Sequence, residues 1–159
     1  MMRYKISLIA VAVLLLWPVG SSFAAGVQGA DAQKELQKFQ GTWVMVSGEK
    51  DGKKGADENV SRSKLIIESD KALVVVPDQT KETILLEIVK TDPSKNPKEY
   101  HFVRKNGPNA GKTMIGIYEF DGDDQFRFAF DPAGATTLKE FTTKEGTGHI
   151  RYTWKRAKP

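Results

Sequence analysis

The stretch KTMIGIYEFDGDDQFRFAF, residues 112–130, contains two runs of β-forming residues on either side of an Asp-Gly pair at 121–122. Asp and Gly tolerate the positive φ angles of tight hairpin turns, so this pattern predicts a β-hairpin. In the second run Phe126, Phe128 and Phe130 alternate with other residues and therefore share one face. A single hairpin cannot cover so large an aromatic face, and the rest of the chain must supply strands that close over it.

The 159-residue chain is long enough for one domain with its own core. Its beginning has the order of a secretory signal peptide: basic residues at Arg3 and Lys5, an apolar run over 6–17, and small residues before and at Ala24. A membrane-spanning helix needs roughly 20 apolar residues, and this run has only about twelve. We therefore expect a signal peptide at residues 1–24 and a secreted or periplasmic product without a stable membrane anchor after cleavage.

Charge and cysteine content narrow the classes of partner. Cleavage after Ala24 removes two of the 24 basic residues, so the formal charge falls from +4 to +2. No expected element carries a stripe of Lys and Arg, and we therefore expect no nucleic-acid partner. Cysteine is absent, so an exported chain of this composition must be held together by burial and by hydrogen bonds between strands.

The hydrophobic pattern changes from helical to alternating near residue 41. One short helix is expected over 31–40, with Asp31 as its cap, after a flexible arm at 25–30. The charged segment 48–62 is expected to be a loop. Strands are expected at about 41–47, 63–68, 72–76, 82–89, 99–104, 113–120, 125–130, 138–142 and 149–155.

About nine short strands at regular spacing indicate an all-β fold. Short connections make successive strands antiparallel neighbours, which favours up-and-down winding over Greek-key crossings. We predict an up-and-down antiparallel β-barrel of about eight to nine strands over residues 41–156, preceded by the arm and short helix at 25–40. The pattern leaves open whether the strand at 138–142 joins the barrel wall or lies across it.

Several motifs that resemble catalytic or metal-binding signatures are better explained as turns or ordinary residues. The Gly-rich segment 107–113 is one residue short of a phosphate loop and precedes a strand where a helix is needed. Residues 121–124 lack the ligand spacing of an EF-type calcium loop, and His101 and His149 are a weak basis for a metal site. With no Gly-x-Ser-x-Gly motif and no paired carboxylates, we expect no enzyme, no metal and no cofactor.

The inward-facing aromatic and aliphatic residues are the candidate ligand contacts. They are Trp43, Met45, Tyr118, Phe126, Phe128, Phe130 and Tyr152. A barrel of about eight strands either holds one small ligand or is filled by its own side chains, and both interpretations remain open. Polar groups at the mouth, such as Arg127 or Tyr118, are expected to give specificity.

One local motif resembles a known fold family. The sequence Gly41-Thr42-Trp43 follows the expected helix and opens the first strand, and a basic strand ends the domain. This resembles the lipocalin-like (calycin) barrels, whose Gly-x-Trp closes the barrel base against a basic residue of the last strand. The resemblance implies that Trp43 plugs one end of the barrel, with Arg151 or Arg156 stacked on its ring.

A closer resemblance covers nearly all of residues 36–156. It is carried by QGTW (40–43), DPSKNPK (92–98), GKT (111–113), GIYEFDGD (116–123), EF (140–141), GH (148–149) and KR (155–156). These segments are similar to a family of exported lipocalin-like domains expanded in planctomycete bacteria. The resemblance implies the barrel fold and export, and it implies no particular activity.

Together these patterns predict an exported lipocalin-like binding protein for a small apolar or amphipathic molecule held in the barrel. The alternative is an interaction module with a filled, ligand-free barrel. In that case the loops at 48–62 and 91–98 would bind a protein or an envelope polymer.

Overall fold

The structure is a computed structural model that describes residues 23–76 and 83–158. The expected signal peptide, 1–24, lies almost entirely outside the described residues. The elements in chain order are α1 (Phe23–Phe39), β1 (Gly41–Lys50), β2 (Lys53–Lys54), α2 (Asp57–Arg62), β3 (Lys64–Glu68), β4 (Lys71–Val75), β5 (Ile84–Asp92), β6 (Lys98–Arg104), β7 (Thr113–Asp121), β8 (Gln125–Phe130) and β9 (Ile150–Arg156).

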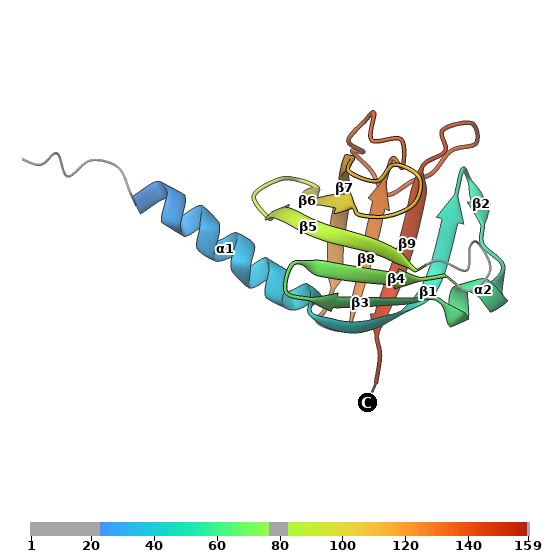
Figure 1. The fold of residues 1–159 in the computed structure, drawn as a ribbon, viewed down its shortest axis with the longest axis horizontal. Helices are drawn as coiled ribbons and strands as arrows, with labels where there is room; N and C mark the ends of the chain where they lie inside the picture. Colours follow the sequence, from blue (N-terminus) through green and yellow to red (C-terminus); the bar gives the residue numbers. More distant parts are fainter. Residues whose placement is uncertain (1–22, 77–82, 159) are drawn as a thin grey trace, which may run out of the picture.

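Eight of the strands form a closed antiparallel barrel (Figure 1). Their order is β1-β3-β4-β5-β6-β7-β8-β9, so each barrel strand pairs with the next one along the chain, and β9 pairs back with β1. The two-residue β2 pairs only with the end of β1. The predicted all-β, up-and-down barrel is confirmed, and ring closure leaves no long unpaired strand edge.

Two segments that were expected to be irregular are partly regular. α1 begins at Phe23, so residues 25–30, the expected arm, are helical. Although residues 25–30 include two Gly, α1 as a whole has four Ala and three Gln in its 17 residues, and both are good helix formers. The segment 48–62 contains the end of β1, the short β2 and the helix α2, and α2 packs against the barrel through the buried Val60.

The expected strand at 138–142 is wrong. The long connection 131–149 contains no strand, and it folds against the outside of the barrel. Its anchor is Leu138, which is buried against Ile117 and Ala129 on the outer face of the β7–β8 hairpin. The apolar residue that suggested a strand is therefore buried by contact with the wall, without any pairing in the sheet.

A β-bulge in β1 changes which residues of that strand face the interior. The pairing of β1 with β9 shifts by one residue between Met45 and Ser47. Before the bulge Trp43 faces inward, and after it Lys50 lies opposite the inward-facing Ile150. Inward positions are thus odd-numbered in the first half of β1 and even-numbered in the second half.

The hairpin of β7 and β8 supplies much of the aromatic core, as its sequence predicted. Phe126 is buried, and Phe128 and Phe130 pack against the same core. Gly116 of β7 leaves room for the ring of Phe128, because a β-carbon built at Gly116 would overlap that ring. Phe128 therefore occupies a space that only the missing side chain of a glycine provides.

We expect Gly116→Ala to lower the free energy of unfolding by about 1–3 kcal/mol, because the Phe128 ring must move or the strands must separate. Urea unfolding followed by tryptophan fluorescence would measure the change. Gly29→Ala in α1 is the matched control, since nothing lies within 4 Å of a β-carbon there, and it should not reduce stability. An unchanged urea midpoint for Gly116→Ala would contradict this packing.

Candidate functional site

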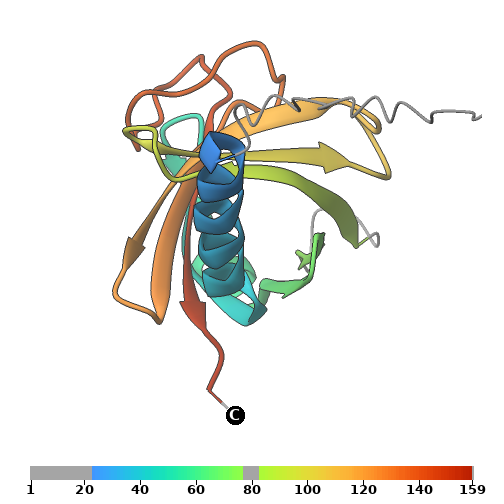
Figure 2. The same ribbon diagram turned by 90° about the vertical axis from the view of Figure 1, so that its left-hand side faces the viewer.

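One end of the barrel is filled by aromatic rings. Figure 2 looks onto this end, with α1 in front of it. Phe39, the last residue of α1, inserts among the strands, with its ring centroid 4.9 Å from that of Tyr118, 4.8 Å from Phe120 and 5.2 Å from Phe126. Trp43 is fully buried beside them. We name these five residues the aromatic plug, and it closes the end of the barrel that α1 covers.

Arg156 holds the aromatic plug to the end of α1. Its guanidinium carbon lies 4.2 Å from the centroid of the Trp43 ring, and its Nη1 and Nη2 donate to the carbonyls of Gln40 (2.8 Å) and Lys38 (3.0 Å). The Trp43 indole N–H donates to the Phe39 carbonyl at 2.8 Å. Carbonyls at the end of a helix lack partners within the helix, so these bonds satisfy them and place a cation at the negative end of the dipole.

Two other arginines face the outside of the barrel. Of the two candidates for the stack on Trp43, Arg151 instead pairs with Glu49 at 2.7 Å. Arg127 forms an ion pair with Glu119, and its guanidinium lies 4.3 Å from the centroid of the Phe141 ring. The prediction that Arg127 lies at the barrel mouth is therefore wrong, because strand alternation directs it outward, beneath the 131–149 connection.

A buried carboxylate ties α1 to the barrel wall. The Glu35 side chain is only 6% exposed, and it pairs with Lys98 of β6 at 2.6 Å and with Lys38 at 2.8 Å. Burial acts to raise the pKa of Glu35, but the hydrogen bonds and charges of Lys38 and Lys98 outweigh it and hold that pKa below its usual value. Burial, together with the nearby charge of Glu35, raises the pKa of Tyr118.

A cavity of about 240 Å³ lies inside the barrel, beyond the aromatic plug. Most of its wall is apolar and consists of Phe39, Leu65, Ile67, Val74, Val76, Ile84, Leu86, Tyr100, Phe102, Met114, Phe126, Phe128, Phe130, Pro132, Ile150, Tyr152 and Trp154. Three polar side chains complete it, Lys50, Arg104 and Asn109. Because a water molecule takes about 30 Å³ of liquid, the cavity has room for roughly eight groups of that size. The barrel interior is therefore not filled.

The structure brings four of the seven sequence-predicted contacts together around this cavity. Phe126, Phe128, Phe130 and Tyr152 line it. The other three are buried outside the lining: Trp43 and Tyr118 belong to the aromatic plug, and Met45 packs in the same core. Tyr118 is thus at the closed end, and the expectation that it lies at the mouth is wrong.

The polar residues of the cavity were not identified from the sequence. The inward direction of Arg104 could have been predicted from the sequence. Tyr100, Phe102 and Arg104 alternate along one face of a strand that was expected at 99–104. The inward direction of Lys50 could not have been predicted, because regular alternation from Trp43 would place it on the outer face. Only the bulge turns it inward.

Two tyrosines, the buried Tyr100 and the half-buried Tyr152, give the cavity wall a polar component. Burial raises the pKa of both Tyr100 and Tyr152, because an ionised phenol would lack the solvation of water. Each therefore keeps its proton at neutral pH and can donate a hydrogen bond. The lining contains no carboxylate among the described residues.

These features define an eight-stranded antiparallel barrel of the lipocalin-like type, closed at one end by a helix, Trp43 and Arg156, with an apolar cavity beyond that closure. The chain matches no protein-family model, no curated protein and no solved structure. The resemblance to the planctomycete family thus rests on its motifs alone. Neither helix in the described part of the chain is long and apolar enough to cross a membrane. Within residues 23–76 and 83–158 there is no group of three or more His, Cys, Asp or Glu positioned to hold a metal ion.

We expect Arg156→Lys to lower the free energy of unfolding by about 1–3 kcal/mol, because Lys keeps the charge but loses the planar stack on Trp43 and the forked donation to two carbonyls. Urea unfolding would measure the loss. Arg62→Lys on the exposed α2 is the control and should change stability by less than about 0.5 kcal/mol. Equal stabilities for the two variants would contradict the role of Arg156.

The Glu35 ion pairs should make stability depend on pH. A carboxyl whose pKa is lower in the folded than in the unfolded chain stabilises the fold above the unfolded value, here 4.5, and this stabilisation is lost as the pH falls through the folded pKa. Glu35→Gln should therefore be less stable than the parent at pH 7, by about 1–3 kcal/mol, and the difference should shrink toward pH 3.

Chemical unfolding of both proteins between pH 7 and pH 3 would test this dependence. Glu145→Gln is the control, because it removes the same charge from an exposed position away from α1. Two results would contradict the role of Glu35: a constant difference between parent and Glu35→Gln across the pH range, or an equal loss for the control.

Proposed function

We propose that this chain is an exported lipocalin-like binding protein that holds one small apolar or amphipathic molecule in the barrel cavity. The observation that supports the proposal is the cavity of about 240 Å³ with its aromatic and aliphatic wall. A ligand that fills a largely apolar cavity gains both hydrophobic burial and packing contacts. The size of the space favours a ligand smaller than the drug-sized molecules that occupy pockets of about 300–1,000 Å³.

Export and family membership are parts of the same proposal. Export is supported by the signal-peptide pattern at residues 1–24, and membership of the planctomycete family of exported domains is supported by the quoted motifs. We propose binding without catalysis, because the cavity wall carries no histidine, serine or carboxylate among the described residues.

The proposal predicts saturable binding of 1-octanol, and a variant that fills the cavity should abolish it. Val74 is buried and lines the cavity from β4, so Val74→Phe places a ring where the ligand would lie. The affinity of the Val74→Phe variant for 1-octanol should be at least about tenfold lower than that of the parent, the equivalent of about 1.4 kcal/mol. Isothermal titration calorimetry and the fluorescence of Trp154, which also lines the cavity, would measure it.

Val46→Phe is the matched control. Val46 lies in the bulge of β1 and is 46% exposed, so the same substitution there leaves the cavity unchanged and should leave the affinity unchanged. Urea unfolding establishes that both variants are folded. The proposal fails if the parent protein binds neither 1-octanol nor other eight-carbon probes, or if Val74→Phe binds 1-octanol as tightly as the parent.

One observation favours the alternative function, an interaction module. The outer face of β3, β4 and β5 carries a groove that includes Ile66, Leu73 and Leu85, and Leu85 is 43% exposed. Such a groove offers apolar contact area to another macromolecule. The two functions are separable, because Leu85→Asp should disrupt binding to the outer face and leave 1-octanol binding intact.

A further inference from the structure

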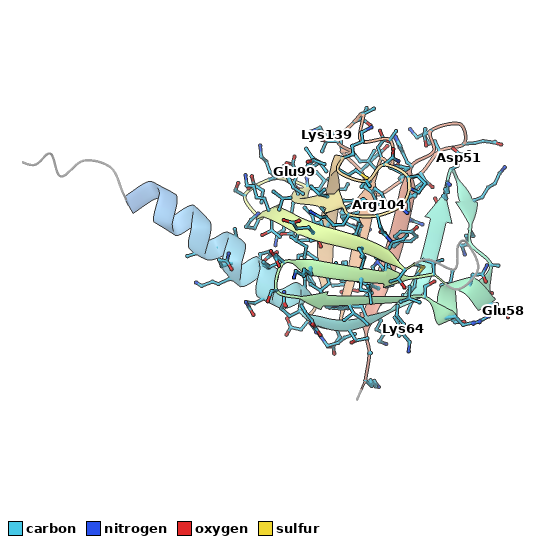
Figure 3. All side chains as sticks on the ribbon, viewed as in Figure 1. Asp51, Glu58, Lys64, Glu99, Arg104 and Lys139 are labelled. Atoms are coloured by element: carbon cyan, nitrogen blue, oxygen red, sulfur yellow. The ribbon has the colours of Figure 1, made fainter. Side chains whose placement is uncertain are left out.

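The rim of the cavity carries two cationic side chains, Lys50 and Arg104. Lys50 is the last residue of β1 and Arg104 is the last residue of β6. In the ring of eight strands, three strands separate β1 from β6 on either side. The two cations therefore approach the cavity from opposite walls, at the end of the barrel that is away from the aromatic plug. Figure 3 shows Arg104 farther from α1 than Glu99, which lies at the other end of the same strand.

Backbone geometry directs both side chains inward. Arg104 follows Tyr100 and Phe102 at two-residue spacing, and all three line the cavity. Its Nε donates to the Asn106 carbonyl at 2.7 Å, which orients the guanidinium and uses only one of its five N–H donors. Lys50 faces inward because of the bulge in β1.

The acidic residues near the rim are engaged elsewhere. Asp131 is buried and accepts backbone hydrogen bonds from its own loop, including one of 2.8 Å from the N–H of Ala133. Glu49 pairs with an arginine on the outer face, and Glu87 pairs with a lysine there. Asp51 accepts a hydrogen bond of 2.8 Å from the Gly148 N–H. Among the described residues, no ion pair links Lys50 or Arg104 to a carboxylate, and no carboxylate lines the cavity.

We propose that the ligand is a small amphipathic anion, a monocarboxylate of about eight carbons in all, given about 30 Å³ for each group. Its head lies between Lys50 and Arg104, and its tail lies along the aromatic wall. Asn109, which also lines the cavity, donates one amide N–H to the Pro132 carbonyl at 3.3 Å and has a second N–H that can bind the head. Charge-assisted hydrogen bonds favour the anion over a neutral head, and the same charges repel a cationic one. This inference rests on the proposed function and specifies its ligand class.

Three probes of eight carbons each test the head-group preference: octanoate, 1-octanol and octylamine, titrated at pH 7.5 in low salt. We expect octanoate to bind about tenfold more tightly than 1-octanol, because two partly exposed cations attract the carboxylate and gain little from a hydroxyl. Octylamine should bind more weakly than 1-octanol. The advantage of octanoate should also decline as salt is added, because the rim charges face solvent.

Variants assign the preference to the two cations. In the double variant Lys50→Gln/Arg104→Gln, octanoate and 1-octanol should bind with equal affinity. The matched control is Lys64→Gln/Lys105→Gln, which removes the same charge from exposed residues on the outer face of β3 and just after β6. This control should retain the preference for octanoate.

The possible results separate the two proposals. Equal binding of octanoate and 1-octanol by the parent, or tighter binding of octylamine, overturns the inference and leaves the proposed function intact. An unchanged preference in the Lys50→Gln/Arg104→Gln variant overturns the assignment to these residues. If the parent binds none of the three probes, the proposed function fails and the inference fails with it.

Discussion

The contact between the Arg156 guanidinium and the Trp43 ring is the interaction on which the rest of the structure depends. It joins the last strand to the first at the point where the barrel closes, and the same guanidinium binds carbonyls at the end of α1. The end of α1 in turn positions Phe39, whose ring contacts four others. Ring closure, helix docking and the floor of the cavity therefore form one cooperative unit.

The cavity exists because the two halves of the wall differ in side-chain volume. Strands β6 to β9 direct large rings inward, among them Phe102, Phe128 and Tyr152, whereas β3 and β4 contribute Leu65 and Val74. An eight-stranded barrel is just wide enough for its own side chains to fill. Where aliphatic residues face aromatic ones beyond the aromatic plug, the side chains do not meet across the barrel, and a space of ligand size remains.

Much of the fold could be predicted from the sequence because local pattern and global architecture agree. The aromatic alternation at 126–130 and the final basic strand both indicated the correct faces. The errors have two different causes. Leu138 is buried on the outer wall without strand pairing, whereas Arg127 lies between the inward-facing Phe126 and Phe128, so strand alternation places it on the outer face, where it pairs with Glu119. For the site, sequence pattern found the aromatic half and missed Lys50 at the rim, because a one-residue irregularity in β1 has no clear signal in the residues around it.

The bulge in β1 determines which charged side chain of that strand lies at the cavity rim. Glu49 and Lys50 are neighbours of opposite charge. Glu49 lies on the outer face, where it pairs with Arg151, and Lys50 lines the cavity. A regular ladder through the same residues would exchange them, since a slip of one position turns every side chain to the other face. The composition of the chain would be identical, yet the rim would carry Glu49 opposite Arg104 and would lose its excess of positive charge. The charge at the cavity rim therefore depends on the backbone geometry of β1 as well as on which residues the chain contains.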